Sequence, residues 1–298
     1  MDKRAVIIGN FDGVHLGHQY VIGRLRDEAV CRGLKTMAIT FDKHPKEIFD
    51  ASFVPAYITT VEEKVEMLMA TGLDDVCVIP FTREFADITA RDFLRWLYDE
   101  KGVRLLLLGY DNRFGRYNAD EAFPQYQQYG KEIGIEVLQS DSFVVAAEEG
   151  RDVPPPSSSL IRHLIMSGDM EGAAMLLGRP YSLSGIVEKG YQEGRKIGFP
   201  TANITHPVGK LLPPNGVYAT SVFLPSTTAP MPSITNVGTR PTYGSHKVTI
   251  ETHIPDFIGD LYGAALRIDF TRKIRNERQF SSPEELRKQI EKDIHEVR

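Results

Sequence analysis

The sequence has few of the features that mark membrane, disulfide-stabilised or nucleic-acid-binding proteins. No apolar run approaches the roughly 20 residues that span a bilayer, and the segment MDKRAVIIGNFDG turns polar too early for a signal peptide. Only Cys31 and Cys77 are present, without the CxxC spacing of zinc or redox sites, so both are expected to be reduced core residues. With 35 basic and 40 acidic residues, the net charge of −5 provides no basic face for DNA or RNA. These absences predict a cytoplasmic protein with no membrane or nucleic-acid partner.

Length and composition favour a globular protein with two domains. The 298 residues are 42% hydrophobic and 25% charged, which is ordinary for a chain that packs a core. Single cores rarely grow beyond about 250–300 residues, so two domains fit this length better than one. No internal repeat or low-complexity segment is visible.

Up to about Gln139, short apolar runs alternate with longer segments of helical pattern, which is typical of βαβ units and a parallel sheet. Capping boxes are expected where Thr60 precedes Glu63 and where Thr89 precedes Asp92. The glycines expected to end helices are Gly33, Gly72 and Gly102. The predicted strands are Arg4–Ile8, Lys35–Phe41, Asp75–Pro80, Arg104–Leu108 and Glu136–Gln139.

The second half of the chain has a different character. The prolines of Arg151–Pro156 break the helical pattern, and two helices, Ser157–Gly168 and Asp169–Gly178, are expected to pack back on the first sheet. From Tyr181 onward, short alternating strands separated by Gly, Pro and Asn turns indicate a β-barrel or sandwich. The strands expected there include Gly216–Leu224, Lys247–Ile254 and Ala264–Phe270. A final helix should begin after Ser282, with Pro283 at its first position and Glu285 in a capping box.

The segment Gly9–His18, GNFDGVHLGH, connects the first predicted strand to a helix, at the position where open α/β sheets bind ligands. Its glycines let the backbone approach a phosphate closely, and the helix N-terminus supplies free N–H donors. His15 and His18 could each donate an imidazole N–H to charge developing on an α-phosphate and on departing pyrophosphate. We therefore assign both histidines as catalytic. The nucleotide-binding residues predicted in this segment are Gly9, Asn10, Phe11, Gly13 and Gly17.

This segment differs from the phosphate loop of kinases, because it has no GxxxxGK[ST] pattern. The difference favours attack at the α-phosphate of ATP, that is, transfer of an adenylyl group. Such a reaction needs no protein nucleophile, only positioning, charge neutralisation and usually Mg²⁺. The alternative is that the two histidines form a chance pair in a glycine-rich turn.

A second candidate site lies in the β-rich half. Thr201 and Asn203 offer a hydroxyl and an amide oxygen, which are hard ligands suited to Mg²⁺ beside phosphate oxygens, although the same residues could cap a turn. Just before them, a run of glycines could expose backbone N–H groups to a nucleotide or could form plain turns. These glycines are Gly185, Gly190, Gly194 and Gly198, of which Gly190 and Gly198 are assigned to nucleotide binding.

Alternation along Lys247–Ile254 places Val248, Ile250, Thr252 and Ile254 on one face of a strand. Glu251 then faces the other way, as a solvated carboxylate or as a functional one. Farther along, Arg275 in the run RKIRNE could bind phosphate or flank a ligand, or could belong to a solvated charged face.

Several motifs resemble one family, the bacterial bifunctional riboflavin kinase and FAD synthetase. In the first half they are GNFDGVHLGH, FDKHP (Phe41–Pro45), GYDNRFG (Gly109–Gly115) and SSSLIR (Ser157–Arg162). In the second half they are LLGRPYSLSG (Leu176–Gly185), GFPTANI (Gly198–Ile204), PPNGVYA (Pro213–Ala219), NVGTRPTYG (Asn236–Gly244) and VTIETHI (Val248–Ile254). The resemblance covers nearly the whole chain, and GFPTANI is far more specific than HxGH.

The resemblance implies a Rossmann-like nucleotidyltransferase domain over residues 1–180 and a small β-barrel riboflavin kinase domain with a C-terminal helix over residues 181–298. The barrel would phosphorylate riboflavin to FMN with ATP, and the first domain would adenylate FMN to FAD, with Mg²⁺ serving both. The resemblance places Asp111 near the adenylyl-transfer phosphates and makes Glu251 the general base of the kinase. A second phosphate-binding element would contain Ser158, Ser159 and Arg162, the last with a catalytic role. It would also place His44 and Phe114 near the flavin. Arg275 is assigned to flavin binding as well, on the basis of its charged run.

Three positions depart from the family pattern: Lys43 stands where a proline is usual, Asn112 where an aromatic is usual, and Ser159 where a threonine is usual. Serine keeps the hydroxyl, whereas Asn112 loses aromatic area. The competing interpretations are therefore a chain with only one active domain, or a flavin-binding regulator without turnover. The partners expected in the main interpretation are the small molecules riboflavin, FMN and ATP.

Overall fold

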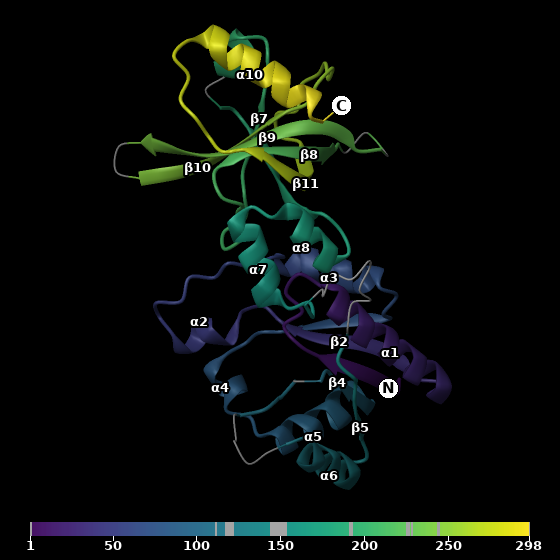
Figure 1. The fold of residues 1–298 in the computed structure, drawn as a ribbon. Helices are drawn as coiled ribbons and strands as arrows, with labels where there is room; N and C mark the ends of the chain where they lie inside the picture. Colours follow the sequence, from purple (N-terminus) through teal and green to yellow (C-terminus); the bar gives the residue numbers. More distant parts are fainter. Residues whose placement is uncertain are drawn as a thin grey trace. The chain divides into compact units, whose positions relative to one another are not determined.

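The computed structural model describes residues 2–110, 112–116, 122–143, 154–190, 193–224, 227, 229–242 and 245–297. By its internal contacts the chain divides into two units, Met1–Ser158 and Ser159–Arg298 (Figure 1). The first unit contains a parallel sheet and the second a closed antiparallel barrel, so the fold class predicted from the sequence is confirmed.

The sheet of the first unit has the order β3-β2-β1-β4-β5, with all strands parallel. Its strands match the predicted ones to within one residue at any end. They are β1 (Arg4–Ile8), β2 (Lys35–Phe41), β3 (Asp75–Ile79), β4 (Val103–Leu108) and β5 (Glu136–Gln139). In this order the direction of winding reverses between β1 and β4, and such a switch point opens a crevice at the carboxyl ends of the strands.

Helices cover both faces of the sheet, because successive residues of a strand point to opposite sides. Val6 and Ile8 of β1 pack in one core with residues of α5 and α6, whereas Ala5 and Ile7 pack in another with residues of α1 and α3. The helices of this unit are α1 (Leu16–Arg32), α2 (Pro45–Phe49), α3 (Val61–Ala70), α4 (Arg83–Ala86), α5 (Ala90–Lys101) and α6 (Phe123–Ile133).

The predicted helix ends are largely correct. Thr60 and Glu63 form a reciprocal capping box, Thr89 accepts from the Asp92 N–H, and Gly33 and Gly102 end their helices in the left-handed conformation. The cysteine prediction is half wrong, because Cys31 on the outer face of α1 is exposed and only Cys77 is partly buried.

The barrel of the second unit has the closed order β10-β7-β6-β11-β8-β9. Its strands are β6 (Tyr181–Glu188), β7 (Ala202–Ile204), β8 (Gly216–Phe223), β9 (Met231–Thr242), β10 (Ser245–His253) and β11 (Ala265–Arg275). The helices of the unit are α7 (Ser158–Ser167), α8 (Met170–Leu177), α9 (Glu193–Lys196) and α10 (Pro283–His295). Large apolar side chains fill the barrel around Tyr181, Tyr218 and Phe270, all of which are fully buried.

The two helices after the proline run occur at the predicted places, but α8 packs differently from expectation. Helix α8 contacts β6 and β11 of the barrel, and all of α7 except Ser158 belongs to the same unit. The sequence predicted that both helices pack on the first sheet, because apolar spacing shows that a helix face is buried but does not show which partner covers it. The functional boundary near residue 180 stays a prediction.

Helix α10 begins after Ser282, which accepts from the Glu285 N–H, while the Glu285 carboxylate binds Ser281. An ion pair attaches this helix to β11. The Arg275 guanidinium donates to both carboxylate oxygens of Asp293, with its shortest contact at 2.8 Å, and the Asp293 side chain is only 3% exposed. Across the described ranges, no helix is long and apolar enough to cross a membrane.

This ion pair yields a stability prediction. Asp293→Ala should lower the free energy of unfolding of the barrel by about 3 kcal/mol, because it leaves the partly buried guanidinium without its carboxylate. Glu291→Ala is the matched control on the same helix; its pair with Arg287 is exposed and should contribute less than about 1 kcal/mol. Urea unfolding followed by far-ultraviolet circular dichroism measures both, and equal losses would contradict the assignment.

Candidate active sites

The loop between β1 and α1 adopts an unusual backbone conformation. Phe11, Gly13 and Val14 all have positive φ, at 50°, 82° and 39°. Glycine reaches this region freely, but phenylalanine and valine do so only when their surroundings hold them there. Phe11 and Val14 are buried, with 4% and 2% of their surface exposed, so their side chains anchor the strained backbone in the core.

Hydrogen bonds from a distant segment hold the same loop. The buried Asp12 carboxylate accepts from the Ile58 and Thr59 N–H groups at 3.2 and 3.0 Å, and the Gly13 N–H donates to the Thr59 hydroxyl at 3.0 Å. The Ser158 hydroxyl donates to the Asp12 carbonyl at 2.8 Å. Asp12 and Thr59 were not predicted as site residues. The sequence around Thr59 does not indicate a site residue, because Thr59 and Thr60 are simply two threonines before a helix.

His15 and His18 lie together at the start of α1, as the sequence predicted. His15 is the N-cap, and its Nδ1 accepts from the His18 N–H at 3.4 Å. The two imidazole rings stack with centroids 3.6 Å apart. Both rings line a cavity of about 440 Å³ at the carboxyl ends of β1 and β4. The other predicted residues that line it are Gly9, Asn10, Phe11, Gly17 and Ser158.

A larger cavity of about 600 Å³ adjoins the first. It is rich in aromatic side chains, and both predicted flavin-binding residues of this unit, His44 and Phe114, line it. The further aromatic residues of its lining are Phe41, Phe49, Phe81, Phe85 and Phe93. They were not singled out from the sequence, because apolar residues at such spacing are usually plain core.

The two cavities share part of one wall, made of Ile8, Gly9, Asn10 and Asn112. Asn112 fixes this wall by donating from Nδ2 to the Ile8 carbonyl at 2.8 Å, which joins the loop after β4 to the end of β1. The residue that departs from the family pattern thus has a structural partner here. An occupant of one cavity would meet an occupant of the other at this wall.

In the barrel, Glu251 and Asn203 lie directly opposite each other on the paired strands β10 and β7. Opposed residues of an antiparallel pair share a face, so both side chains project from the same side of the sheet. Ile250 and Thr252 are buried on the other side, as the alternation predicted. Gly190 packs on Asn203: a Cβ at Gly190 would lie 2.1 Å from the Asn203 Nδ2.

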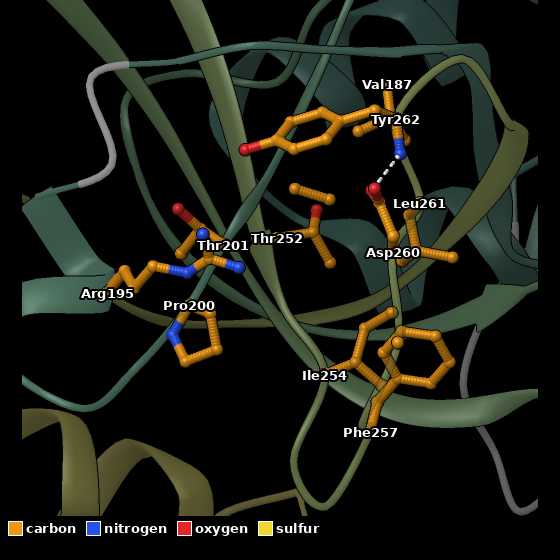
Figure 2. A pocket seen from close by; sticks show the side chains of 12 residues that line it. Val187, Arg195, Pro200, Thr201, Thr252, Ile254, Phe257, Asp260, Leu261 and Tyr262 are labelled. Carbon is orange, nitrogen blue, oxygen red and sulfur yellow. Dashed lines mark hydrogen bonds between the residues drawn. The ribbon is translucent and has the colours of Figure 1, made fainter.

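The barrel unit also contains two hollows. Figure 2 shows the smaller, of about 80 Å³, with Thr201 and Arg195 on one side and Asp260 and Tyr262 on the other. The Asp260 carboxylate accepts from the Tyr262 N–H at 2.9 Å, which shapes the loop that closes this side. An open cleft of about 750 Å³ between α9 and α10 contains Gly198, whose φ is 93°. Glu251, Asn203 and Gly190 line neither hollow.

Comparisons with known proteins agree with this two-unit arrangement. The family model for FAD synthetase matches residues 1–151, and that for riboflavin kinase matches residues 177–298. The bifunctional riboflavin kinase/FMN adenylyltransferase of Escherichia coli K12 is 37% identical over 96% of this chain and 89% of its own length. The protein of that name from Bacillus subtilis is 33% identical over 99% of this chain and 92% of its own length.

The chain belongs to the bifunctional riboflavin kinase/FMN adenylyltransferase family. A crystal structure titled as a macrolide-efflux protein from Streptococcus pneumoniae superposes with a TM-score of 0.90 at 25% identity, covering 100% of this chain and 94% of that one. The resemblance predicted from the motifs is confirmed. Since each half matches its own enzymatic family model, the comparisons support the two-activity interpretation and not its alternatives.

Within this family framework, several assigned residues stay predictions. Asp111 lies outside the described residues. Ser159 and Arg162 are on α7 and belong to the second unit, and their role at the first site stays a prediction. Arg275 has a clear structural role, since its guanidinium binds Asp293 and the Asn276 carbonyl, and its flavin contact stays a prediction.

The close packing of Gly190 yields a test of the kinase half. Gly190→Ala should displace the Asn203 amide and lower riboflavin phosphorylation by about tenfold or more, since small displacements of positioning groups are costly. Adenylylation of supplied FMN serves as the internal control and should not change. Steady-state rates of the two reactions measure the effect. An unchanged rate of phosphorylation would show that the reaction does not depend on the position of the Asn203 amide.

Proposed function

We propose that the parallel-sheet unit transfers an adenylyl group from ATP to FMN and that the barrel unit transfers the γ-phosphoryl group of ATP to riboflavin. The observation that carries the proposal is the wall shared by the two cavities of the first unit. A phosphate-handling loop lines one of them, and aromatic side chains line the other. Adenylylation of FMN needs this arrangement, because its two substrates meet only through their phosphates.

In the first unit, the isoalloxazine ring would occupy the aromatic cavity, where Phe114 and His44 offer apolar and ring surfaces for stacking. The FMN phosphate would then lie at the shared wall. One of its oxygens attacks the α-phosphorus of ATP, the bond to the bridging oxygen breaks, and pyrophosphate leaves. His15, His18 and the N–H groups at the start of α1, which border this cavity, would stabilise the charge on the transferring and leaving phosphates.

In the barrel unit, Glu251 is suited to be the general base of phosphorylation. Its carboxylate would accept the proton of the ribityl 5′-hydroxyl as that oxygen bonds to the γ-phosphorus and ADP leaves. Asn203, directly opposite on β7, and Thr201, just before it, would contact the nucleotide phosphates. The missing Cβ of Gly190 leaves room for its backbone beside the Asn203 amide. Gly198 borders open space, and its φ of 93° is a conformation that favours glycine.

The donor set of the barrel fits magnesium carried by ATP. Thr201 and Asn203 supply neutral oxygen donors, which suit a hard cation whose remaining ligands are phosphate oxygens and water. No cluster of three His, Cys, Asp or Glu side chains that could hold a metal by itself occurs among the described residues. Magnesium bound with ATP would neutralise the charge of the transferring phosphate in each unit.

The direct test supplies the purified chain with riboflavin, ATP and Mg²⁺ and separates the flavins by chromatography. FMN should form first and FAD after it, because the product of the barrel is the substrate of the first unit. FMN and FAD should both be missing when EDTA exceeds Mg²⁺. If neither flavin product forms with Mg²⁺ present, the proposed function is wrong.

A pair of substitutions separates the two reactions. His18→Ala should lower FAD formation by about 100-fold or more and spare FMN formation, because it removes a donor to the reacting phosphates. Glu251→Gln should lower FMN formation from riboflavin by about 100-fold and spare FAD formation from supplied FMN, because the amide cannot accept the proton. The activity that each variant keeps shows that its chain has folded. A loss of both activities in either variant would refute the assignment of the two reactions to separate units.

A further inference from the structure

The first unit contains a buried cation to which the proposed reaction assigns no role. Lys64, on α3, is only 4% exposed, and its Nζ donates to the Phe41 carbonyl at 2.8 Å. Phe41 is the last residue of β2 and lines the aromatic cavity. Lysine is rarely buried to this extent without a charged partner, because an ammonium group loses much hydration energy on leaving water.

Two carboxylates supply the compensating charge. Asp12 bonds the Ile58 and Thr59 N–H groups just before α3, and Asp42 directly follows Phe41, whose carbonyl Lys64 binds. Both carboxylates favour the charged form of Lys64 and so raise its pKa. The acidic neighbour on the same helix, Glu63, is committed to its capping box with Thr60. The lysine therefore lies among the carboxyl ends of two adjacent strands and balances an acidic residue from each.

Each of these carboxylates holds backbone of a different cavity. Asp12 binds the Ile58 and Thr59 N–H groups and so fixes the phosphate-handling loop. Asp42 accepts from the Phe81 N–H at 2.8 Å, and Phe81 lines the aromatic cavity. Lys64 itself binds the carbonyl of Phe41 in the same lining. One ammonium group thus stabilises the supports of both cavities.

We propose that Lys64 is a positioning residue for adenylyl transfer, and that its charged ammonium keeps the phosphate loop and the aromatic cavity in the mutual arrangement that the reaction needs. The inference rests on the proposed function of the first unit. Lys64 contacts neither cavity directly and acts through Asp12, Asp42 and the Phe41 carbonyl. Loss of its charge would leave two carboxylates uncompensated and weaken the bond to Phe41.

The protonation state of this lysine is sensitive to pH in an accessible range. Burial lowers the pKa of Lys64 from its ordinary value of 10.5 to about 8, against the opposing effect of Asp12 and Asp42. The ammonium is therefore mostly charged at pH 7 and mostly neutral at pH 9. The kinase reaction takes place in the other unit and does not depend on this group.

The first experiment uses the unmodified chain with saturating Mg²⁺. FAD formation from supplied FMN is measured between pH 6.5 and 9.5, in parallel with phosphorylation of riboflavin. We expect kcat/KM for FAD formation to fall about tenfold for each pH unit above about 8, with no matching fall in phosphorylation. FAD formation that stays level up to pH 9.5 would refute the inference.

Two variants assign the pH dependence to Lys64. Lys64→Met keeps the length of the side chain without the charge; it should lower kcat/KM for FAD formation at pH 7 by at least tenfold and abolish the decline above pH 8. Lys64→Arg keeps the charge at all these pH values and should move the decline beyond pH 9.5. A Lys64→Met variant that retains the decline of the unmodified chain would overturn the assignment.

Thermal unfolding gives a readout that does not depend on turnover. Between about pH 8 and 10.5 the unfolded chain binds more protons at Lys64 than the folded chain, so this group makes the free energy of unfolding rise with pH. Compared with Lys64→Met, the unmodified chain should therefore gain stability from pH 7.5 to 9.5 while it loses FAD formation. A stability difference that stays constant over this range would contradict a buried, titrating lysine.

These outcomes separate the inference from the function on which it rests. If the unmodified chain forms no FAD at any pH, the proposed adenylyl transfer is refuted, and the role proposed for Lys64 is refuted with it. If FAD forms but the pH profile is level, only the role of Lys64 is refuted. Riboflavin phosphorylation by the Lys64→Met variant shows throughout that the chain has folded.

Discussion

The first site depends on the backbone of one short loop, which Asp12 holds in a conformation that its own residues disfavour. Two non-glycine residues there have positive φ, and each such residue costs of the order of 1–3 kcal/mol. The buried side chains of Phe11 and Val14 and the hydrogen bonds of Asp12 and Thr59 offset this cost. The same restraints place His15 at the N-cap of α1 and turn its ring toward the cavity.

Rigidity of this loop has a chemical reason. Adenylyl transfer uses no protein nucleophile, so the protein contributes geometry and charge, both of which lose effect when donors move. A loop held by Thr40 of β2, by Ile58 and Thr59 before α3 and by Ser158 at the start of α7 keeps its donors in place before substrates bind. The aromatic cavity is fixed by the same strand ends, which explains why a single wall can serve both.

The barrel also holds its candidate site residues in fixed positions, but it does so through strand pairing. Its paired strands place Glu251 opposite Asn203 through backbone register alone, and closure of the barrel leaves the strands little freedom to slip. The α10 helix is attached through Arg275 and Asp293, so a residue that resembled a phosphate ligand in the sequence has a defined structural partner. Charge patterns alone could not distinguish these roles, since a guanidinium suits both.

Much of the local structure followed from the sequence, because its determinants are local. Alternating and helical periods, capping boxes and terminal glycines placed the strands of the sheet and most helix ends, and the GNFDGVHLGH and GFPTANI motifs indicated the two sites and the family. Only the tertiary structure showed which residues from distant parts of the chain complete the two sites. Thr59, Lys64, Phe81 and the Asn112 bond to Ile8 act across long separations along the chain, where no periodicity or spacing records contact. The exposure of Cys31 and the packing of α8 on the barrel were likewise decided by tertiary contacts, because an apolar pattern shows that a face is buried but not against which partner.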